Sequence, residues 1–446
     1  MQSRRDHLQA YQFSVGRLVR AVAAGDAGAG EAPFRRSNLG VIAGTIIAVL
    51  LTGGAVVYGL ISPAASSAWR NPGAIIVEKE TGTRYLYLNG QLRPTANYAS
   101  ALLAAGQKPS VQYVGRDTLH GIAVGATIGI PGAPEDLPAA AALSPGTWAL
   151  CLRADGGTVL DLAPAGRTAA GPVAERVLVA STDPENPAEY LVWNSVKYPL
   201  TEPSVLPALG LGNQQPIPAA PAWLAELPTG APVVPAEVSD AGKQGPAVDG
   251  QPAKVGALFA TNAGGTQQYY VLRPDGLAPV TRTEVALFTV AGAEAPRQVD
   301  AAVIAAAPAS ADRSLLRRLP DLLSGPVFDG SASLCALQSS PGSVGETRLA
   351  TERTATIDAD PAVVVPPGGG MLVQPPGQNP NSGNVIEFLI TDNGEKYLIG
   401  GNGAQSALGY SGATANVVPS RVLGLVPSGP ALDVTSARRT VTWPAG

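Results

Sequence analysis

The longest apolar segment of the chain lies near its N-terminus. Residues 37–69 contain no charged side chain, and Leu39–Ile61 is almost wholly apolar. As an α-helix, this run would extend about 34 Å, enough for a hydrocarbon core of about 30 Å. The pattern predicts one membrane helix over 39–61, although a buried helix or a cleaved signal peptide ending near Ala65–Ala68 would also be apolar. A signal peptide fits less well, because the preceding segment is long and the run exceeds the usual length.

The residues before this run predict a basic amphipathic helix. Apolar side chains recur at three- and four-residue spacing within residues 7–22, and Arg17 and Arg20 lie elsewhere on the helical wheel. This helix could lie on the inner membrane surface or dock to a cytoplasmic partner. Residues 1–36 hold six arginines against three acidic residues (6 − 3 = +3), whereas only Arg70 closely follows the run. The positive-inside rule therefore predicts a cytoplasmic segment 1–38, a linker 62–72 and an exported domain 73–446.

The exported region repeats one pattern of strands and turns. Each copy has a β-branched strand, a turn, a strand bearing a tyrosine and a short helix, with the aligned tyrosines at Tyr85, Tyr190, Tyr270 and Tyr397. The copies lie near 73–106, 174–211, 254–290 and 383–425, and the last begins with a strand at 386–390 and turns at Asn393-Gly394.

Each copy is too small to bury its own apolar face, so the copies must pack on one another or on a shared module. The strand-like segments around Cys151 and Cys335 lie between copies and predict a central β-rich module. Leucines in residues 312–323 predict a further amphipathic helix. The expected fold class is α+β, with a single N-terminal membrane helix.

The composition narrows the possible functions. Charged residues make up 14% of the 446 residues, against about 25% in an average protein, and the net charge is −4. A nucleic-acid partner is therefore not expected, because phosphate backbones recruit clustered Lys and Arg. The chain has two His and two Cys, too few ligands for a zinc or iron–sulfur site. We expect no metal site, no cofactor site and no histidine-based catalytic triad.

The two cysteines predict a disulfide. Cys151 and Cys335 would both be exported to an oxidising compartment, and the sequence has no third cysteine to compete. The bond would join two strand-like segments that are distant in the sequence. The alternative is a pair of free buried thiols.

Other candidate sites are few. The phosphate-binding pattern G-x-x-x-x-G-K-[ST] is absent, because Gln244 follows Gly242-Lys243 and Glu237 replaces the first glycine. Glu78 and Glu80 are expected on the solvated surface, and His120 is expected to be a surface or capping residue. Gly40 and Gly44 form a G-x-x-x-G motif that would permit close packing of membrane helices, although glycine is also common in such helices. Ala55 and Gly59 form a second pair of small residues.

Together these features resemble the EccB family of the type VII (ESX) secretion system. The resemblance rests on a basic N-terminal helix that opens at residues 3–13, on Gly129-Ile130-Pro131-Gly132-Ala133-Pro134 followed by Trp148 and Cys151, and on Pro366–Val373. It implies a scaffolding subunit of the inner membrane with a disulfide-bonded, distorted propeller-like periplasmic domain.

The resemblance also implies partners. They are the EccC motor ATPase, EccD, EccE, the mycosin protease and a second copy of the chain. Members of the family sometimes carry an ATPase label, so the alternative function is an exported nucleotide-binding domain that hydrolyses ATP.

Overall fold

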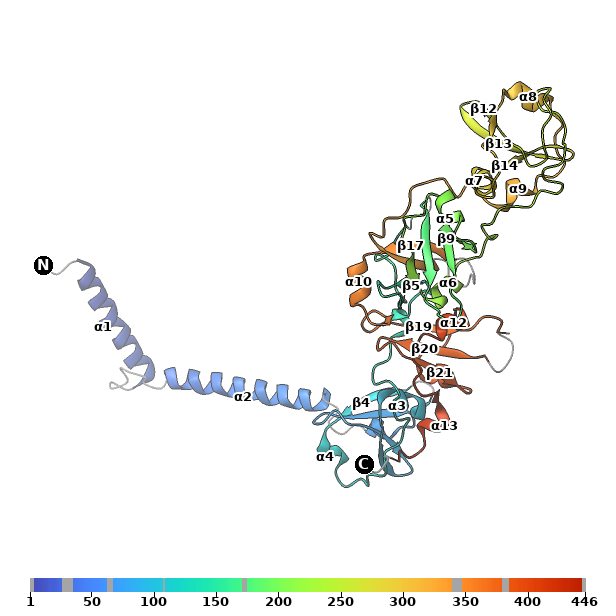
Figure 1. Cartoon of the computed structure of the whole chain (residues 1–446). Coiled ribbons are helices and arrows are strands. Elements are labelled where there is room, and N and C mark those ends of the chain that lie inside the picture. The colour runs from blue at the N-terminus through green and yellow to red at the C-terminus, as the bar shows by residue number, and fades with distance from the viewer. Residues whose placement is uncertain are drawn as a thin grey trace. The chain divides into compact units, whose positions relative to one another are not determined.

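The computed structural model describes residues 4–25, 35–61, 67–106, 109–170, 175–338, 347–378 and 385–442. The chain divides into two units, Met1–Ala68 and Trp69–Gly446, and Figure 1 draws both. Residues 26–34 of the predicted cytoplasmic segment and residues 62–66 of the predicted linker lie outside the described residues.

The described residues of the first unit form two long helices. Helix α1 (Arg4–Ala24) covers the predicted amphipathic stretch, and its apolar side chains, including Leu8, Tyr11 and Leu18, are exposed. Helix α2 (Arg35–Ile61) contains the predicted apolar run and is long and apolar enough over Gly40–Val57 to cross a membrane. The predicted single apolar helix is therefore present.

Three small sheets of the second unit share one strand order. Sheet 1 is β3-β2-β1-β4, sheet 2 is β10-β9-β8-β11 and sheet 3 is β14-β13-β12-β15. In each, the first three strands form an antiparallel meander, and the fourth returns parallel to the first. Their bounds are β1 Ala74–Glu78, β2 Arg84–Leu88, β3 Gln91–Pro94, β4 Ser110–Val114, β8 Val177–Ser181, β9 Glu189–Trp193, β10 Val196–Leu200, β11 Ile217–Ala219, β12 Leu258–Ala263, β13 Thr266–Arg273, β14 Gly276–Val280 and β15 Arg297–Gln298.

Sheet 4 differs from its prediction at its start. Its order is β22-β19-β20-β21-β23, and its strands are β19 Gly370–Gln374, β20 Glu387–Thr391, β21 Lys396–Gly400, β22 Asn416–Val417 and β23 Leu432–Asp433. The strand predicted to be first, 386–390, corresponds to β20 and is the second strand. The first strand, β19, directly follows a Pro- and Gly-rich stretch, which indicates a connection rather than a buried strand.

The remaining sheet has six strands that come from distant parts of the chain. Its order is β18-β6-β5-β16-β17-β7, and Figure 1 shows β5 and β17 from early and late parts of the chain. The strands are β5 Trp148–Leu152, β6 Thr158–Asp161, β7 Ala169–Ala170, β16 Ser333–Gln338, β17 Thr347–Glu352 and β18 Val363–Val364. Strands β5 and β16 pair antiparallel, and Cys151 lies opposite Cys335.

Short helices connect the strands. They are η1 Ser67–Arg70, α3 Tyr98–Ala105, α4 Arg116–Leu119, η2 Ala140–Ala142, α5 Val205–Ala208, α6 Pro221–Ala225, α7 Arg282–Val290, α8 Ala301–Ala306, α9 Ser314–Arg318, α10 Thr354–Ala359, α11 Ala404–Ala407, α12 Ser420–Leu423 and α13 Val434–Ala437. The helix predicted over 312–323 is only α9. It ends because Leu319 precedes Pro320, and the residue before a proline is disfavoured in the helical region.

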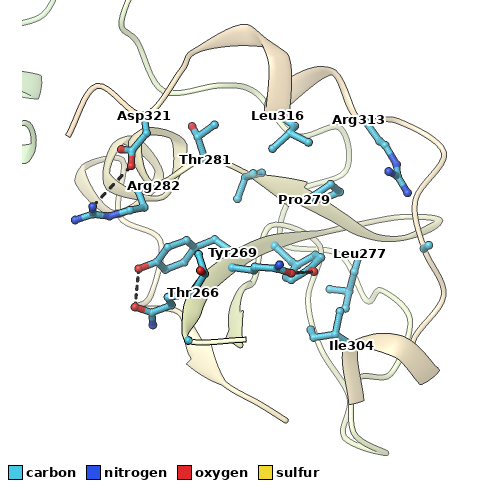
Figure 2. Close-up of a pocket in the computed structure, with 16 residues that line it drawn as sticks. Thr266, Tyr269, Leu277, Pro279, Thr281, Arg282, Ile304, Arg313, Leu316 and Asp321 are labelled. Atoms are coloured by element: carbon cyan, nitrogen blue, oxygen red, sulfur yellow. Dashed lines mark hydrogen bonds and ion pairs between the residues drawn. The ribbon is translucent and has the colours of Figure 1, made fainter. Parts of the chain in front are cut away.

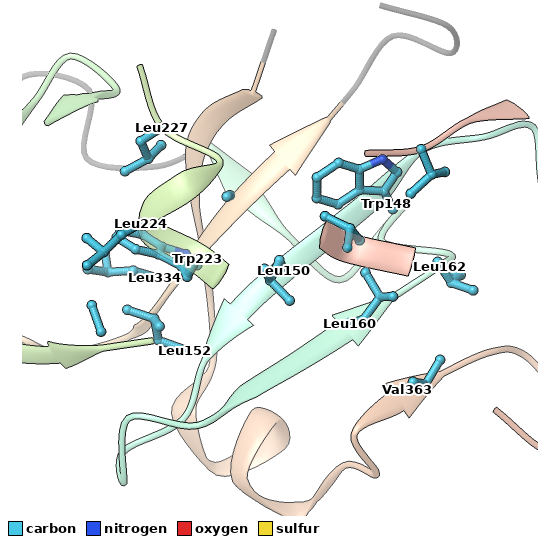
Figure 3. Packing of buried hydrophobic residues seen from close by; sticks show 14 of the residues in the cluster. Trp148, Leu150, Leu152, Leu160, Leu162, Trp223, Leu224, Leu227, Leu334 and Val363 are labelled. Carbon is cyan, nitrogen blue, oxygen red and sulfur yellow. The ribbon is translucent and has the colours of Figure 1, made fainter. Parts of the chain in front are cut away.

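The two faces of β5 bury different side chains. Trp148, Leu150 and Leu152 point into the largest hydrophobic cluster, which Figure 3 shows together with Trp223 and Leu224 of α6. That cluster also includes side chains of sheet 4 and of α12. The opposite face of β5 carries Ala149 and Cys151, as expected for alternating side chains on a strand. The six-stranded sheet therefore shares its core with sheets 2 and 4.

Candidate functional site

The disulfide lies inside the six-stranded sheet. Cys151 and Cys335 are bonded, fully buried and separated by 184 positions in the sequence. Ala149, Val159, Ala350 and Ile357 surround them, and a carboxylate oxygen of the buried Glu352 lies within 4.8 Å of both sulfur atoms. The bond is therefore a covalent link between β5 and β16 that solvent does not reach.

A charged cluster centred on Arg167 lies on the same sheet. Its guanidinium contacts Asp161 at 3.4 Å and Glu352 at 2.8 Å, and it also pairs with Asp360. The carboxylates of Asp161 and Glu352 are almost fully buried, and each has one oxygen without a hydrogen-bond partner. Burial raises the pKa of Asp161, against the opposing effects of the Ala163 N–H and of Arg167. One arginine thus holds together β6, β17 and the segment after α10.

A second buried charge joins sheets 2 and 4. Glu226, at the end of α6, is buried, and its carboxylate accepts hydrogen bonds from the Arg421 guanidinium on α12. The backbone carbonyl of Glu226 also accepts a hydrogen bond from the Thr347 hydroxyl on β17. Glu226 therefore links the end of α6, which follows β11 of sheet 2, to α12, which follows β22 of sheet 4, and to β17 of the six-stranded sheet.

Two lysines bind the ends of these same helices. The Lys197 ammonium on β10 donates to two carbonyls at the end of α6, 2.6 and 2.7 Å away. The Lys396 ammonium on β21 donates to two carbonyls at the end of α12, both 2.6 Å away. Burial lowers the pKa of both lysines. Sequence reasoning missed them, although each begins a Lys-Tyr pair that precedes a Pro-[Thr/Ser]-Gly turn by about thirty residues.

The tyrosine after each lysine lies against a glycine. A Cβ added at Gly429 would overlap the Tyr397 ring, and a Cβ at Gly230 would overlap the Tyr198 ring. Tyr397 is fixed, because it is 1% exposed and hydrogen-bonds to Asn393 and Glu395. Burial, together with the Glu395 hydrogen bond, raises the pKa of Tyr397 to about 12. Neither ring can move aside without loss of packing.

We therefore expect Gly429→Ala to destabilise the second unit. The added methyl overpacks the site, which typically costs about 1–3 kcal/mol. A denaturant titration measures this loss as a difference in the free energy of unfolding. The control glycine must have an ordinary backbone conformation, which excludes Gly377 because its φ is positive. Gly212→Ala is suitable, because Gly212 lies in the same unit and its added Cβ would come no closer than 3.5 Å to Pro207, an ordinary contact. Equal stability of Gly429→Ala and the parent would show that the Tyr397 ring is not tightly held.

A wide groove lies on sheet 3. It measures about 860 Å³ and runs beside β13 and β14, with Tyr269, Arg282 and Arg313 among its lining side chains (Figure 2). Arg282 lies 3.7 Å from Asp321. The lining includes no His, Cys or Lys, and its one carboxylate, that of Asp321, pairs with Arg282.

The structure places the predicted site residues as follows. Gly40 and Gly44 are exposed on α2, and a Cβ at either would meet no other atom within 4 Å. His120 is exposed at the end of α4. The expectation that Glu78 lies on the solvated surface is wrong: it is buried and pairs with Arg116 at 2.6 Å. The Arg116 hydrogen bond, with that of Thr81, lowers the pKa of Glu78. Sequence reasoning assigned Glu78 to the surface because its partner, Arg116, lies far from it in the sequence.

The comparisons with known proteins cover almost the whole chain. Residues 1–442 match the family model described as "Type VII secretion system ESX-1, transport TM domain B". The chain is 28% identical to the ESX-3 secretion system ATPase EccB3 of Mycolicibacterium smegmatis, over 96% of this chain and 89% of that protein.

Two solved structures are similar as well. An intact ESX-5 inner membrane complex contains a chain that matches with a TM-score of 0.66 at 24% identity, over 100% of this chain and 97% of that one. A dimer of EccB3 from the ESX-3 core complex matches with a TM-score of 0.64 at 27% identity, over 82% of this chain and 100% of that one. The mixed α+β architecture is therefore shared with these chains. The protein belongs to the EccB family and is a core membrane component of the type VII (ESX) secretion system.

Proposed function

We propose that this protein is a scaffolding subunit that holds other components of the ESX inner membrane complex together. The observation that carries the proposal is the use of its buried and half-buried charged groups. Arg167, Glu226, Lys197 and Lys396 all bind other parts of the same chain, so they stabilise an assembly of sheets. Groups that are committed in this way are not available for acid–base chemistry.

The proposed orientation places residues 1–38 in the cytoplasm and residues 73–446 in the periplasm. The net charge of +3 before the apolar helix supports it. Protease added to spheroplasts should then digest the second unit and spare α1. Protection of the second unit would show the opposite orientation.

The proposed arrangement of the second unit is a set of repeats around a central module. The strand order common to sheets 1 to 3, which sheet 4 extends by β23 at one edge, supports the repeats. The hydrophobic cluster common to the six-stranded sheet, sheet 2 and sheet 4 supports a central position for the six-stranded sheet. The distorted propeller-like geometry of the family is the corresponding proposal for the whole second unit.

The proposed partners are those of the family: EccC, EccD, EccE, the mycosin protease and a second copy of this chain. The match to a chain of an ESX-5 inner membrane complex and the match to an EccB3 dimer support assembly and self-association.

The alternative function is ATP hydrolysis, because the name of an M. smegmatis relative includes the word ATPase. A test for this activity distinguishes a scaffold from an enzyme. The purified full chain should be incubated with radiolabelled ATP beside the EccC motor ATPase as a positive control. The scaffold proposal predicts no turnover above that of a heat-denatured sample. Turnover that survives extensive purification and disappears with one substitution in one groove would refute it.

The glycines of α2 give a test of packing within the membrane. Gly40→Ile with Gly44→Ile keeps the helix apolar but blocks close approach of a second helix. We expect the double variant to insert normally and to yield less assembled complex on native gels. The matched control is Gly53→Ile with Gly54→Ile, which changes the same residue type elsewhere on α2. Assembly equal to that of the parent would show that Gly40 and Gly44 are not contact residues.

A further inference from the structure

Strand β4 forms an open edge of sheet 1. It has five residues, and only β1 pairs with it in the described part of the chain. The exposed fractions of Val111 and Tyr113 are 39% and 68%. The Ser110 N–H donates to Gly73, and the Val114 carbonyl accepts from Lys79, so alternate backbone groups of β4 face β1. The backbone N–H and C=O groups of Val111 and Tyr113 therefore face away from the sheet.

The corresponding edges of the other three sheets are protected. Strand β11 contains Pro218, which cannot donate a backbone hydrogen bond. Strand β15 has two residues, and its Arg297 side chain donates to Gln251. Strand β22 also has two residues, and its Asn416 amide donates to the Ser144 carbonyl. Proline, charge, shortness and covering segments are the usual means of blocking strand addition. Within β4 itself none of them occurs, and Pro109 stands just before the strand, outside the residues that would pair.

We propose that β4 pairs antiparallel with β4 of a second copy, about a two-fold axis through Gln112. This inference rests on the proposed function, because it names the surface for self-association. The sequence Ser-Val-Gln-Tyr-Val carries no charge, so two copies of it meet without repulsion. In this register Val111 lies opposite the partner's Tyr113, and the outward backbone groups form four hydrogen bonds.

The chemistry of the edge favours a second copy over a different protein. The isologous pair places an aromatic side chain opposite a β-branched one on each side of the axis, which is a favourable cross-strand pairing. An uncharged strand offers little to select a charged partner. The membrane anchor also confines both copies to one surface, which raises their effective concentration and allows a small contact to suffice.

The register makes the test specific. Gln112 would face the partner's Gln112 in a non-hydrogen-bonded pair, where the Cα atoms of opposite residues lie about 4.5 Å apart. That separation suits a disulfide. The full chain contains two cysteines, which bond to each other, so Gln112→Cys introduces a single thiol. After mild oxidation in membranes, non-reducing gels should show a cross-linked dimer. Gln91→Cys, on β3 of the same sheet, should cross-link at least ~10-fold less.

A second variant tests the edge without a new thiol. Val111→Lys with Tyr113→Lys alters two exposed side chains and places like charges opposite each other across the axis. We expect the dimer fraction of the detergent-solubilised full chain to fall by about tenfold, with unchanged thermal unfolding. If the Gln112→Cys chain assembles with other ESX components but forms no cross-linked dimer, the β4 contact alone is refuted. An unchanged dimer fraction in the lysine variant would refute it as well. A cross-link from Gln112→Cys to a different protein would also refute it. A parent chain that forms no complex would refute the proposed function instead.

Discussion

Replacement of both cysteines, Cys151→Ala with Cys335→Ala, is expected to lower the free energy of unfolding of this protein by about 2–5 kcal/mol. The bond closes a loop of 184 positions, for which the loop-entropy relation gives an upper value of about 5 kcal/mol. Alanine is the suitable replacement, because a serine hydroxyl would lie near the buried Glu352 carboxylate, and a new hydrogen bond to it would offset part of the loss. The measurement is a guanidinium titration of the parent and of the double variant.

Reduction of the parent provides the control for the cysteine prediction. In a guanidinium titration under reducing conditions, the free energy of unfolding of the parent should fall by the same amount as that of the double alanine variant, since both then lack the covalent link. Mass spectrometry of the oxidised parent should find one linked peptide pair. Labelling of both cysteines by a thiol reagent in the native protein, or equal stability of the variant and the parent, would contradict a structural role for the bond.

Arg167→Met is expected to destabilise the second unit by about 3–5 kcal/mol. Removal of one partner from a buried ion pair leaves an uncompensated charge, and the effect is larger than the net value of the pair. Here the loss leaves the carboxylates of Asp161 and Glu352 buried, with side-chain exposures of 1% and 3%. Methionine retains most of the aliphatic volume, so the variant reports chiefly the missing charge. Arg317→Met is the matched control, because Arg317 is exposed and should change stability by less than about 0.5 kcal/mol.

The pH dependence separates charge from packing in this variant. Burial raises the pKa of Asp161 already in the parent, so the folded chain binds that proton more tightly than the unfolded chain. The contribution of Asp161 to stability therefore falls as pH rises through its folded pKa. Without Arg167 this dependence should steepen, and the deficit of the variant should shrink as the pH is lowered from neutral toward the carboxylate range. A deficit that does not change with pH would mean that lost packing, rather than charge, causes it.

The sequence predicts those parts of the fold that depend on local patterns. The apolar run contained in α2 is visible without a structure, and so is α3, whose Asn97 side chain accepts from the Ser100 N–H as an N-cap. The strands that carry Cys151 and Cys335 were also expected. In contrast, β19 was not predicted, because the Gly-rich stretch before it is typical of a connection. The helix at α9 was predicted too long, because the effect of the single Pro320 was not taken into account.

The buried contacts were harder to predict because they join distant residues. Arg167 and Glu352 lie 185 positions apart, and Glu226 and Arg421 lie 195 apart. No periodicity links such residues, so a single sequence gives each of them only as a surface charge. The cysteines are the exception, because a chain with two cysteines in an oxidising compartment leaves one possible pairing. The disulfide of the site could thus be predicted from the sequence, whereas the buried ion pairs could not.

The most direct test of the scaffolding role is to identify the membrane proteins that co-purify with the full chain. A tagged full chain should be solubilised from membranes in mild detergent, purified, and examined by native gel and quantitative mass spectrometry. The same preparation from the Gly40→Ile, Gly44→Ile variant would serve as the comparison for complex yield. We predict one large complex that contains the EccC motor ATPase, EccD and EccE in fixed ratios to this chain. Recovery of the parent chain by itself, folded and free of these proteins, would contradict the scaffolding role.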